Sequence, residues 1–280
     1  MLCPACLARP RGFAPGPGGR PEARCPSCQA LERHRFLATL LAAVRQEHGA
    51  AGLVLEVAPT PAVTRLLRRS DAAYLGMDIA PAADGRTVGL VADLCRMPLA
   101  SRTVDLAVVF HVFEHIPDDT TAMAELARVL AGGGLALIQV PWRPHQHTDE
   151  DPAAPEPERI RRFGQADHVR FYGADFEDRL RCTGLATIRV RPEDLLPDDL
   201  VASLGLSDPT PVWLATAGDG PTPFGPQEGA LAALRHRLEP DAVAEWRRVS
   251  ALPPGPAPLP SWVRRLARTR AGRAIRRLGP

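Results

Sequence analysis

The chain has 280 residues and a net charge of +2, and all 34 of its basic side chains are arginine. Because lysine is absent, the sequence excludes a Schiff-base lysine, a pyridoxal-phosphate anchor and the phosphate-binding lysine of a P-loop or a kinase. No apolar leader follows Met1, and no uncharged apolar run reaches the roughly 18 residues of a membrane span. We therefore expect a cytoplasmic protein without a transmembrane segment, whose thiols stay reduced.

Four of the six cysteines form two C-x-x-C pairs near the N-terminus. Cys3 and Cys6 are followed, after 18 residues, by Cys25 and Cys28. Each such turn directs two thiolates at one centre, and four thiolates satisfy tetrahedral Zn²⁺ without an open position. The spacing therefore predicts a structural zinc ribbon over residues 1–30. The alternatives are a redox-active pair or a chance spacing.

After the ribbon, the apolar pattern predicts one helix and then a regular alternation of strands and helices. The linking helix is expected over residues 31–48 of a linking region 31–50, with Gly49 ending it. Strands are predicted at 53–58, 73–79, 87–92, 104–110, 134–140, 185–190 and 212–217, and helices at 61–69, 118–130 and 173–182. This alternation is typical of an α/β fold, here a doubly wound, Rossmann-like, mostly parallel seven-stranded sheet over residues 51–220.

Two regions break this rhythm. Residues 142–167 are polar and interrupted by prolines, and a loop of that length in a compact domain is usually functional or mobile. Residues 221–280 combine proline-rich linkers, a helical segment at 230–250 and a basic helical tail with seven arginines and no acid in its last 20 residues. Such a tail is compatible with binding to an anionic membrane surface, RNA or an acidic partner. The alternatives are a helix docked on the same domain or an unstructured tail.

Three acids, Glu56, Asp78 and Asp93, fall at or just after the ends of the first three predicted strands. Parallel strands place their carboxyl ends at one edge of the sheet, where ligands of doubly wound folds bind. A carboxylate at that edge can accept both hydroxyls of a ribose or an amino group. A single acid there is more often a helix cap or a solvated side chain. Three acids in strand order favour a nucleotide-like ligand.

The segments around these acids resemble the motif series of class I S-adenosylmethionine-dependent methyltransferases of the type 11-like group. The similarity covers roughly residues 53–217. It is carried by residues 55–59 (LEVAP), 74–78 (YLGMD), 91–94 (VADL), 104–116 (VDLAVVFHVFEHI) and 123–130 (MAELARVL), and by the glycines that follow. The cysteine leader joined to residues 31–35 (LERHR) resembles a bacterial subgroup that places a zinc ribbon before this domain.

The resemblance implies how the edge would hold S-adenosylmethionine. Glu56 would face the methionine ammonium, and Asp78 would bind the ribose hydroxyls. Asp93, with Leu94, would meet the adenine.

One stretch departs from the family pattern. Most members carry a glycine-rich loop after the first strand, whereas this chain has Ala58 and Pro59 there and no glycine. Without glycine, close backbone approach and a positive φ become costly.

The reactive end of the donor falls in a histidine-rich part of the chain. The resemblance implies that Phe110 and His111 line that end, with Glu114 and His115 just beyond them. His145 and His147 are candidate acceptor contacts, and their spacing also suits metal ligands. The alternative for both is a solvated loop.

A second group follows, in which His168, Arg170 and Tyr172 alternate, so that an extended segment would direct them to one side. Histidine is the natural general base near neutral pH, and arginine pairs with carboxylate or phosphate. We predict that His168 or His111 is the base, with His115 third, and that Arg170 and Tyr172 contact the acceptor. The alternative is that His168 caps the helix beginning near Gly173 while Arg170 pairs with Asp175.

The leading interpretation is a methyltransferase that uses S-adenosyl-L-methionine and a structural zinc ion. It would methylate oxygen or nitrogen of a polar small molecule or sugar-like metabolite by in-line transfer, with a histidine general base. One alternative is an RNA base methyltransferase that binds its substrate through the ribbon, although Phe13 is the ribbon's only aromatic residue. Another is a module of the same fold that transfers no methyl group.

Overall fold

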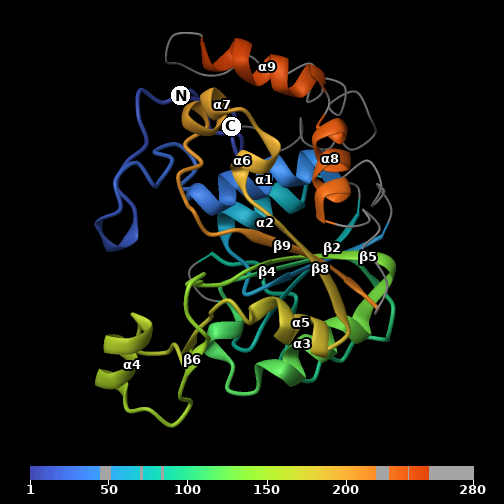
Figure 1. The fold of residues 1–280 in the computed structure, drawn as a ribbon. Helices are drawn as coiled ribbons and strands as arrows, with labels where there is room; N and C mark the ends of the chain where they lie inside the picture. The colour runs from blue at the N-terminus through green and yellow to red at the C-terminus, as the bar shows by residue number, and fades with distance from the viewer. Residues whose placement is uncertain (45–51, 70–71, 83–84, 219–226, 239, 252–280) are drawn as a thin grey trace.

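In the computed structural model, a seven-stranded sheet lies between two layers of helices (Figure 1). The structure describes residues 1–44, 52–69, 72–82, 85–218, 227–238 and 240–251. The N-terminal ribbon contains a short 3-10 turn, η1 (Pro17–Gly19), and packs on the helical layer formed around α1.

The sheet confirms the predicted α/β class. Its strands are β1 (Leu53–Val57), β2 (Ala73–Asp78), β3 (Leu90–Val91), β4 (Val104–Phe110), β5 (Leu130–Gln139), β8 (Leu185–Val190) and β9 (Val212–Ala217). They lie in the order β3-β2-β1-β4-β5-β9-β8, in which the first five are parallel and β9 is antiparallel to both neighbours. Strand order reverses between β1 and β4, which defines the point where such sheets bind ligands.

Both faces of the sheet are covered by helices. Because successive strand residues point to opposite sides, each strand contributes to two buried clusters. In β4, Leu106 and Val108 join one buried cluster, whereas Ala107 and Val109 join the other. The first cluster lies under α1 (Glu32–Val44), α2 (Pro61–Leu67) and α8 (Gln227–Arg237), near α6 (Pro192–Leu195), α7 (Asp198–Ser203) and α9 (Pro240–Ser250). The second lies under α3 (Asp119–Val129) and α5 (Phe176–Cys182). Within the described ranges, no helix is both long and apolar enough to cross a membrane.

Local sequence explains where the helices of the domain begin. Thr60 and Asp118 each accept a hydrogen bond from a backbone N–H of the first turn of α2 and α3. Pro61 follows Thr60 at the first helical position of α2, where a missing N–H costs nothing. These caps fix the first turns of α2 and α3, which follow β1 and β4 along the chain.

The structure differs from the predicted elements at several places. Residues 142–167 are not an unstructured loop, because they contain β6 (Asp149–Glu150) and α4 (Glu156–Phe163), and β6 pairs with β7 (Arg170–Phe171). Strand β5 starts at Leu130 and runs through the glycines that were expected to precede it. The helical segment at 230–250 is two helices, α8 and α9, while α6 and α7 were not predicted. Gly49 and the basic tail lie outside the described residues.

Arg35 of α1 joins the ribbon to the segment after α7. Its fully buried guanidinium donates to the carbonyls of Ala23 (2.9 Å) and Ala30 (3.2 Å) in the ribbon, and to that of Gly205 beyond α7. It also stacks on the ring of Phe13 at 3.8 Å. Burying a guanidinium requires partners for its donors, so the ribbon, α1 and the segment after α7 form one packed unit.

We expect Arg35→Leu to destabilise the folded protein by about 3 kcal/mol or more, because buried carbonyls lose their donors. Thermal unfolding followed by circular dichroism measures this loss. Arg24→Leu is the matched control, since the Arg24 side chain is exposed in the same ribbon. Equal unfolding temperatures for the two variants would contradict the anchoring role of Arg35.

Candidate active site

The strand register gathers the predicted site residues at the carboxyl edge of the sheet. Val57 of β1 is aligned with Met77 of β2 on one side and with Val109 of β4 on the other. The residues that follow, Ala58, Asp78 and His111, therefore lie along one edge at the point of strand reversal.

Two residues at this edge have left-handed backbone conformations. Ala58 has a φ of 52° and His111 a φ of 55°, and both still donate a backbone hydrogen bond of 2.8 Å to the neighbouring strand. Ala58 thus adopts, without glycine, the positive φ that the sequence marked as costly. Each such residue costs of order 1–3 kcal/mol, and residues of this kind concentrate at ligand sites. The backbone strain therefore lies directly after β1 and β4, the two strands that flank the reversal point.

Glu56 is buried just before this edge. Its carboxylate accepts hydrogen bonds from Thr60 N (2.8 Å), Thr64 Oγ1 (2.7 Å) and Tyr74 OH (2.6 Å). Burial raises the pKa of Glu56, and the hydrogen bonds from Tyr74 and Thr64 oppose that shift. The carboxylate is therefore held in a fixed position near the end of β1 by three hydrogen-bond donors.

Asp78 ends β2 and already has a cationic partner. Its Oδ2 accepts from Arg86 Nη1 at 2.6 Å, and its Oδ1 accepts from Ala80 N at 3.0 Å. Beside it, Ile79 is 75% exposed and Val91 is 54% exposed, the two largest exposures among the bulky apolar residues that the structure describes. Sequence reasoning missed this apolar pair and Arg86, although an isoleucine directly after a strand-end acid was a usable signal.

The two predicted adenine contacts, Asp93 and Leu94, lie beyond β3. Asp93 is exposed and accepts from Cys95 N at 2.8 Å, so it shapes the turn there. Leu94 is buried in the core between the sheet and α3.

His111 forms a pair with a buried acid. Its Nδ1 lies 3.1 Å from Glu114 Oε1, and the Glu114 side chain has no exposed surface. Because a carboxylate accepts, this contact favours the proton on Nδ1 and the lone pair on Nε2. Among the described residues, that Nε2 has no hydrogen-bond partner. Phe110, the last residue of β4, is partly buried beside it.

Two further histidines meet beside Glu114. His115 ends the 3-10 turn η2 (Phe113–His115), and its ring lies edge-to-face on that of His168, with centroids 4.6 Å apart. His168 Nδ1 is 3.1 Å from the carbonyl of Phe163, and burial lowers the pKa of His168. His168 is therefore a neutral imidazole at neutral pH, with its Nε2 lone pair directed away from Phe163.

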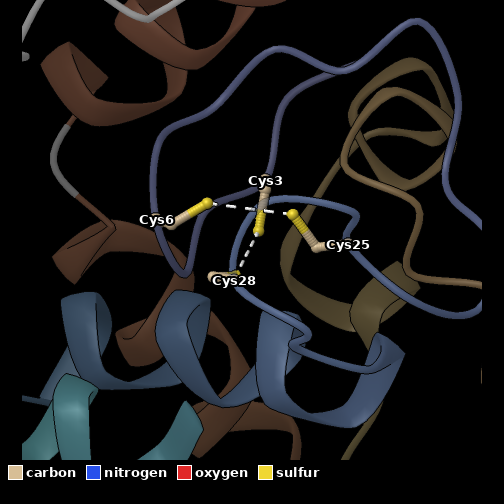
Figure 2. A group of neighbouring side chains, drawn as sticks. All are labelled: Cys3, Cys6, Cys25 and Cys28. Carbon is tan, nitrogen blue, oxygen red and sulfur yellow. Dashed lines mark hydrogen bonds between the residues drawn. The ribbon is translucent and has the colours of Figure 1, made fainter.

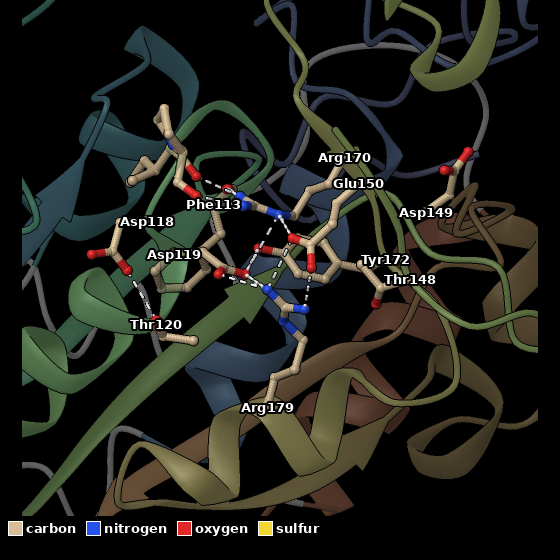
Figure 3. Close-up of polar contacts among 12 residues, drawn as sticks. Phe113, Asp118, Asp119, Thr120, Thr148, Asp149, Glu150, Arg170, Tyr172 and Arg179 are labelled. Atoms are coloured by element: carbon tan, nitrogen blue, oxygen red, sulfur yellow. Dashed lines mark hydrogen bonds and ion pairs between the residues drawn. The ribbon is translucent and has the colours of Figure 1, made fainter. Parts of the chain in front are cut away.

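Arg170 and Tyr172 are buried in an ion-pair network (Figure 3). Arg170 donates to the carbonyls of Phe113 and Pro117, each at 2.8 Å, and pairs with Glu150. Tyr172 donates to Asp119 at 2.7 Å. Both side chains therefore make their contacts within the protein. Arg170 pairs with Glu150 and Asp119, not with Asp175.

The other two histidines predicted for the site lie apart from this group. His145 and His147 are exposed, and His147 Nδ1 lies 3.8 Å from Asp175 Oδ1. Neither belongs to a set of candidate metal ligands within the described part of the chain.

The four ribbon cysteines converge (Figure 2). The Sγ atoms of Cys3 and Cys28 are 3.7 Å apart, and those of Cys6 and Cys25 are 3.8 Å apart. A tetrahedral zinc ion with Zn–S bonds of about 2.3 Å requires sulfur atoms about 3.8 Å apart. The arrangement of these donors therefore fits a four-thiolate zinc site.

Part of the sheet matches a known family model. Residues 55–138 match the family model described as a methyltransferase domain. A stretch of 52 residues is 42% identical to a probable S-adenosylmethionine-dependent methyltransferase from two strains of Mycobacterium tuberculosis. That match spans 19% of this chain and only 19% of the relative's length.

Solved structures with a similar arrangement have low sequence identity to the chain. The YcgJ protein of Bacillus subtilis is 15% identical, with a TM-score of 0.45 over 65% of this chain and 99% of its own. The [4+2]-cyclase SpnF is 16% identical, with a TM-score of 0.45 over 88% of this chain and 86% of its own.

Proposed function

Because residues 55–138 belong to the methyltransferase domain family and the chain shares sequence with S-adenosylmethionine-dependent methyltransferases, we propose that this protein transfers the methyl group of S-adenosylmethionine to a polar small molecule. The observation that carries the proposal is the position of three site residues at the carboxyl edge of the sheet. The matched segment contains the strands that bring Glu56, Asp78 and His111 to one side of the sheet.

The donor would lie along this edge. Glu56 would receive the methionine ammonium, and the strained Ala58 with Pro59 would let the backbone pass close to it. Asp78 would accept from the ribose hydroxyls, for which Arg86 must share or leave the carboxylate.

The adenine would lie at the far end of the same edge. Asp93 and the segment at Leu94 would meet its polar rim. The exposed side chains of Ile79 and Val91 would cover its faces, since burying them removes apolar surface from water.

His111 is the general base that the geometry supports best. Its Nδ1 is held by the buried Glu114, its Nε2 is unpartnered, and it follows Phe110 at the expected reactive end. An acceptor oxygen or nitrogen would attack the methyl carbon while its proton moves to His111 Nε2. The bond from sulfur to the methyl carbon would break, and the sulfonium would leave as neutral S-adenosylhomocysteine.

The other predicted acceptor residues divide into two groups. Arg170 and Tyr172 would act as positioning residues, since both are buried in contacts that hold the segment next to His168. His145 and His147 are exposed and stay predicted acceptor contacts, as does an anionic partner for the tail.

The competing functions find less support. Phe13 is buried under Arg35, so the ribbon's one aromatic ring is not free to stack on an RNA base. Ala58 reaches a positive φ without glycine, which weakens the argument for a domain that binds no donor.

The four cysteines would hold a structural zinc ion that closes the ribbon. The ion would supply folding energy there, because it would link the two C-x-x-C turns through four bonds.

Isothermal titration calorimetry tests donor binding directly. We expect one equivalent of S-adenosylmethionine or S-adenosylhomocysteine to bind, and Asp78→Asn to weaken binding about 10-fold to 100-fold, because charged hydrogen bonds contribute about 1.5–3 kcal/mol. Asp178→Asn, at an exposed acid of α5, is the matched control. No heat of binding with either ligand would overturn the proposed function.

Substitution of His111 tests the base. We expect His111→Gln to lower kcat about 10²-fold to 10⁴-fold while leaving donor affinity within a factor of about three, because only proton transfer is lost. Release of S-adenosylhomocysteine in the presence of a panel of hydroxy and amino metabolites provides the assay. Wild-type turnover by this variant would exclude His111 as the base.

Loss of one thiolate tests the ribbon metal. We expect Cys25→Ser to lose bound zinc and to unfold at a lower temperature, whereas Cys182→Ser, at an exposed cysteine, retains both properties. Metal analysis after dialysis gives the zinc content. A wild-type protein that neither holds zinc nor gains thermal stability from it would contradict this assignment.

A further inference from the structure

A second set of metal-ligating side chains lies beside the proposed base. Glu114 and His115 come from η2, and His168 comes from the segment before β7. One donor atom from each of the three lies within 4.8 Å of the others. Two imidazoles and one carboxylate form a donor set that zinc and other divalent transition ions take up in proteins.

Two of these side chains are buried with an unsatisfied atom. Glu114 has no exposed side-chain surface, and its Oε2 has no hydrogen-bond partner among the described residues. His168 is 3% exposed, and its Nε2 is likewise without a partner there. A buried polar atom left without a partner costs about 1–3 kcal/mol, so such an atom calls for an unseen ligand. Two of them in one cluster point to the same ligand.

The opposite atom of each side chain is already held. His168 Nδ1 contacts the carbonyl of Phe163, and His115 Nδ1 lies 3.2 Å from Asp167 Oδ2. Glu114 Oε1 contacts His111 Nδ1. Metal-binding histidines are usually oriented in this way, with one ring nitrogen on a carbonyl or carboxylate and the other on the ion. Each histidine is thus left with Nε2 as its available donor.

The backbone keeps the two segments together. Val169 N donates to the carbonyl of Glu114 at 2.9 Å, and Arg170 donates to the carbonyls of Phe113 and Pro117, on either side of Glu114 and His115. The buried guanidinium therefore fixes His168 against η2 before any ligand binds.

We infer that Glu114, His115 and His168 bind a divalent transition-metal ion. Three protein ligands leave coordination positions open, and an acceptor hydroxyl could take one of them. This consequence rests on the proposed function, whereas metal binding does not. On the ion, the hydroxyl would pass its proton to His111 Nε2, the proposed base. Its oxygen would form the new bond to the methyl carbon as the bond from sulfur to carbon breaks.

Cobalt(II) titration of metal-stripped full-length protein separates the two metal sites. We expect two equivalents to bind: one with the intense near-ultraviolet bands of sulfur-to-cobalt charge transfer from the ribbon, and one with only weak visible bands. Glu114→Gln and His168→Gln should lose the second equivalent and keep the first. His115→Gln, at a partly exposed side chain, should weaken the second by about tenfold or more and serves as the variant least able to disturb folding.

The control is His147→Gln, which changes an exposed histidine outside the cluster and should retain both equivalents. A wild-type protein that binds only the sulfur-ligated equivalent would overturn the inference. So would a second equivalent that survives in all three cluster variants. Calorimetry with S-adenosylhomocysteine under the same conditions keeps the two proposals distinct, because failure of donor binding leaves the cobalt result readable.

Discussion

A buried guanidinium constrains the geometry of the candidate site. Arg170 has almost no exposure, so each of its donors must find an acceptor within the protein. It finds them in the carbonyls of η2 and the turn that follows, and in Glu150 of β6. Arg179 adds a second cation between Glu150 and Asp119 (Figure 3). The segment between β5 and β7 is therefore bound to the edge of the sheet. As a consequence, His168 lies next to Glu114.

The sheet was predictable because its strands are apolar runs buried on both faces. In a doubly wound fold, burial on both sides requires nearly continuous apolar sequence, as residues 104–110 show. The bounds of β4, β8 and β9 agree with the prediction residue for residue. The cysteine spacing also anticipated the convergence of four sulfur atoms, because two tight turns leave few alternatives to a shared centre.

The chemistry of the second segment could not be predicted in the same way. Alternation placed His168, Arg170 and Tyr172 on one side of an extended segment, and all three are indeed buried. Sequence does not reveal whether such a side faces a cleft or the protein interior, since the partners lie about 50–60 residues away in the chain. Helix α4 could not be predicted for the same reason. Its charged sequence is typical of a loop, and its Arg162 pairs with Asp149 and Asp151 in a preceding part of the chain.

The linking helix couples the ribbon to this edge of the sheet. Arg35 anchors α1 in the ribbon. Burial lowers the pKa of Arg33, the second residue before it, and the charge of Glu114 opposes this shift. Burial lowers the pKa of His34 to about 3, so it stays neutral and adds no positive charge beside His111. The first turn of α1 thus carries both the arginine that anchors the ribbon and two residues that lie close to charged groups of the site.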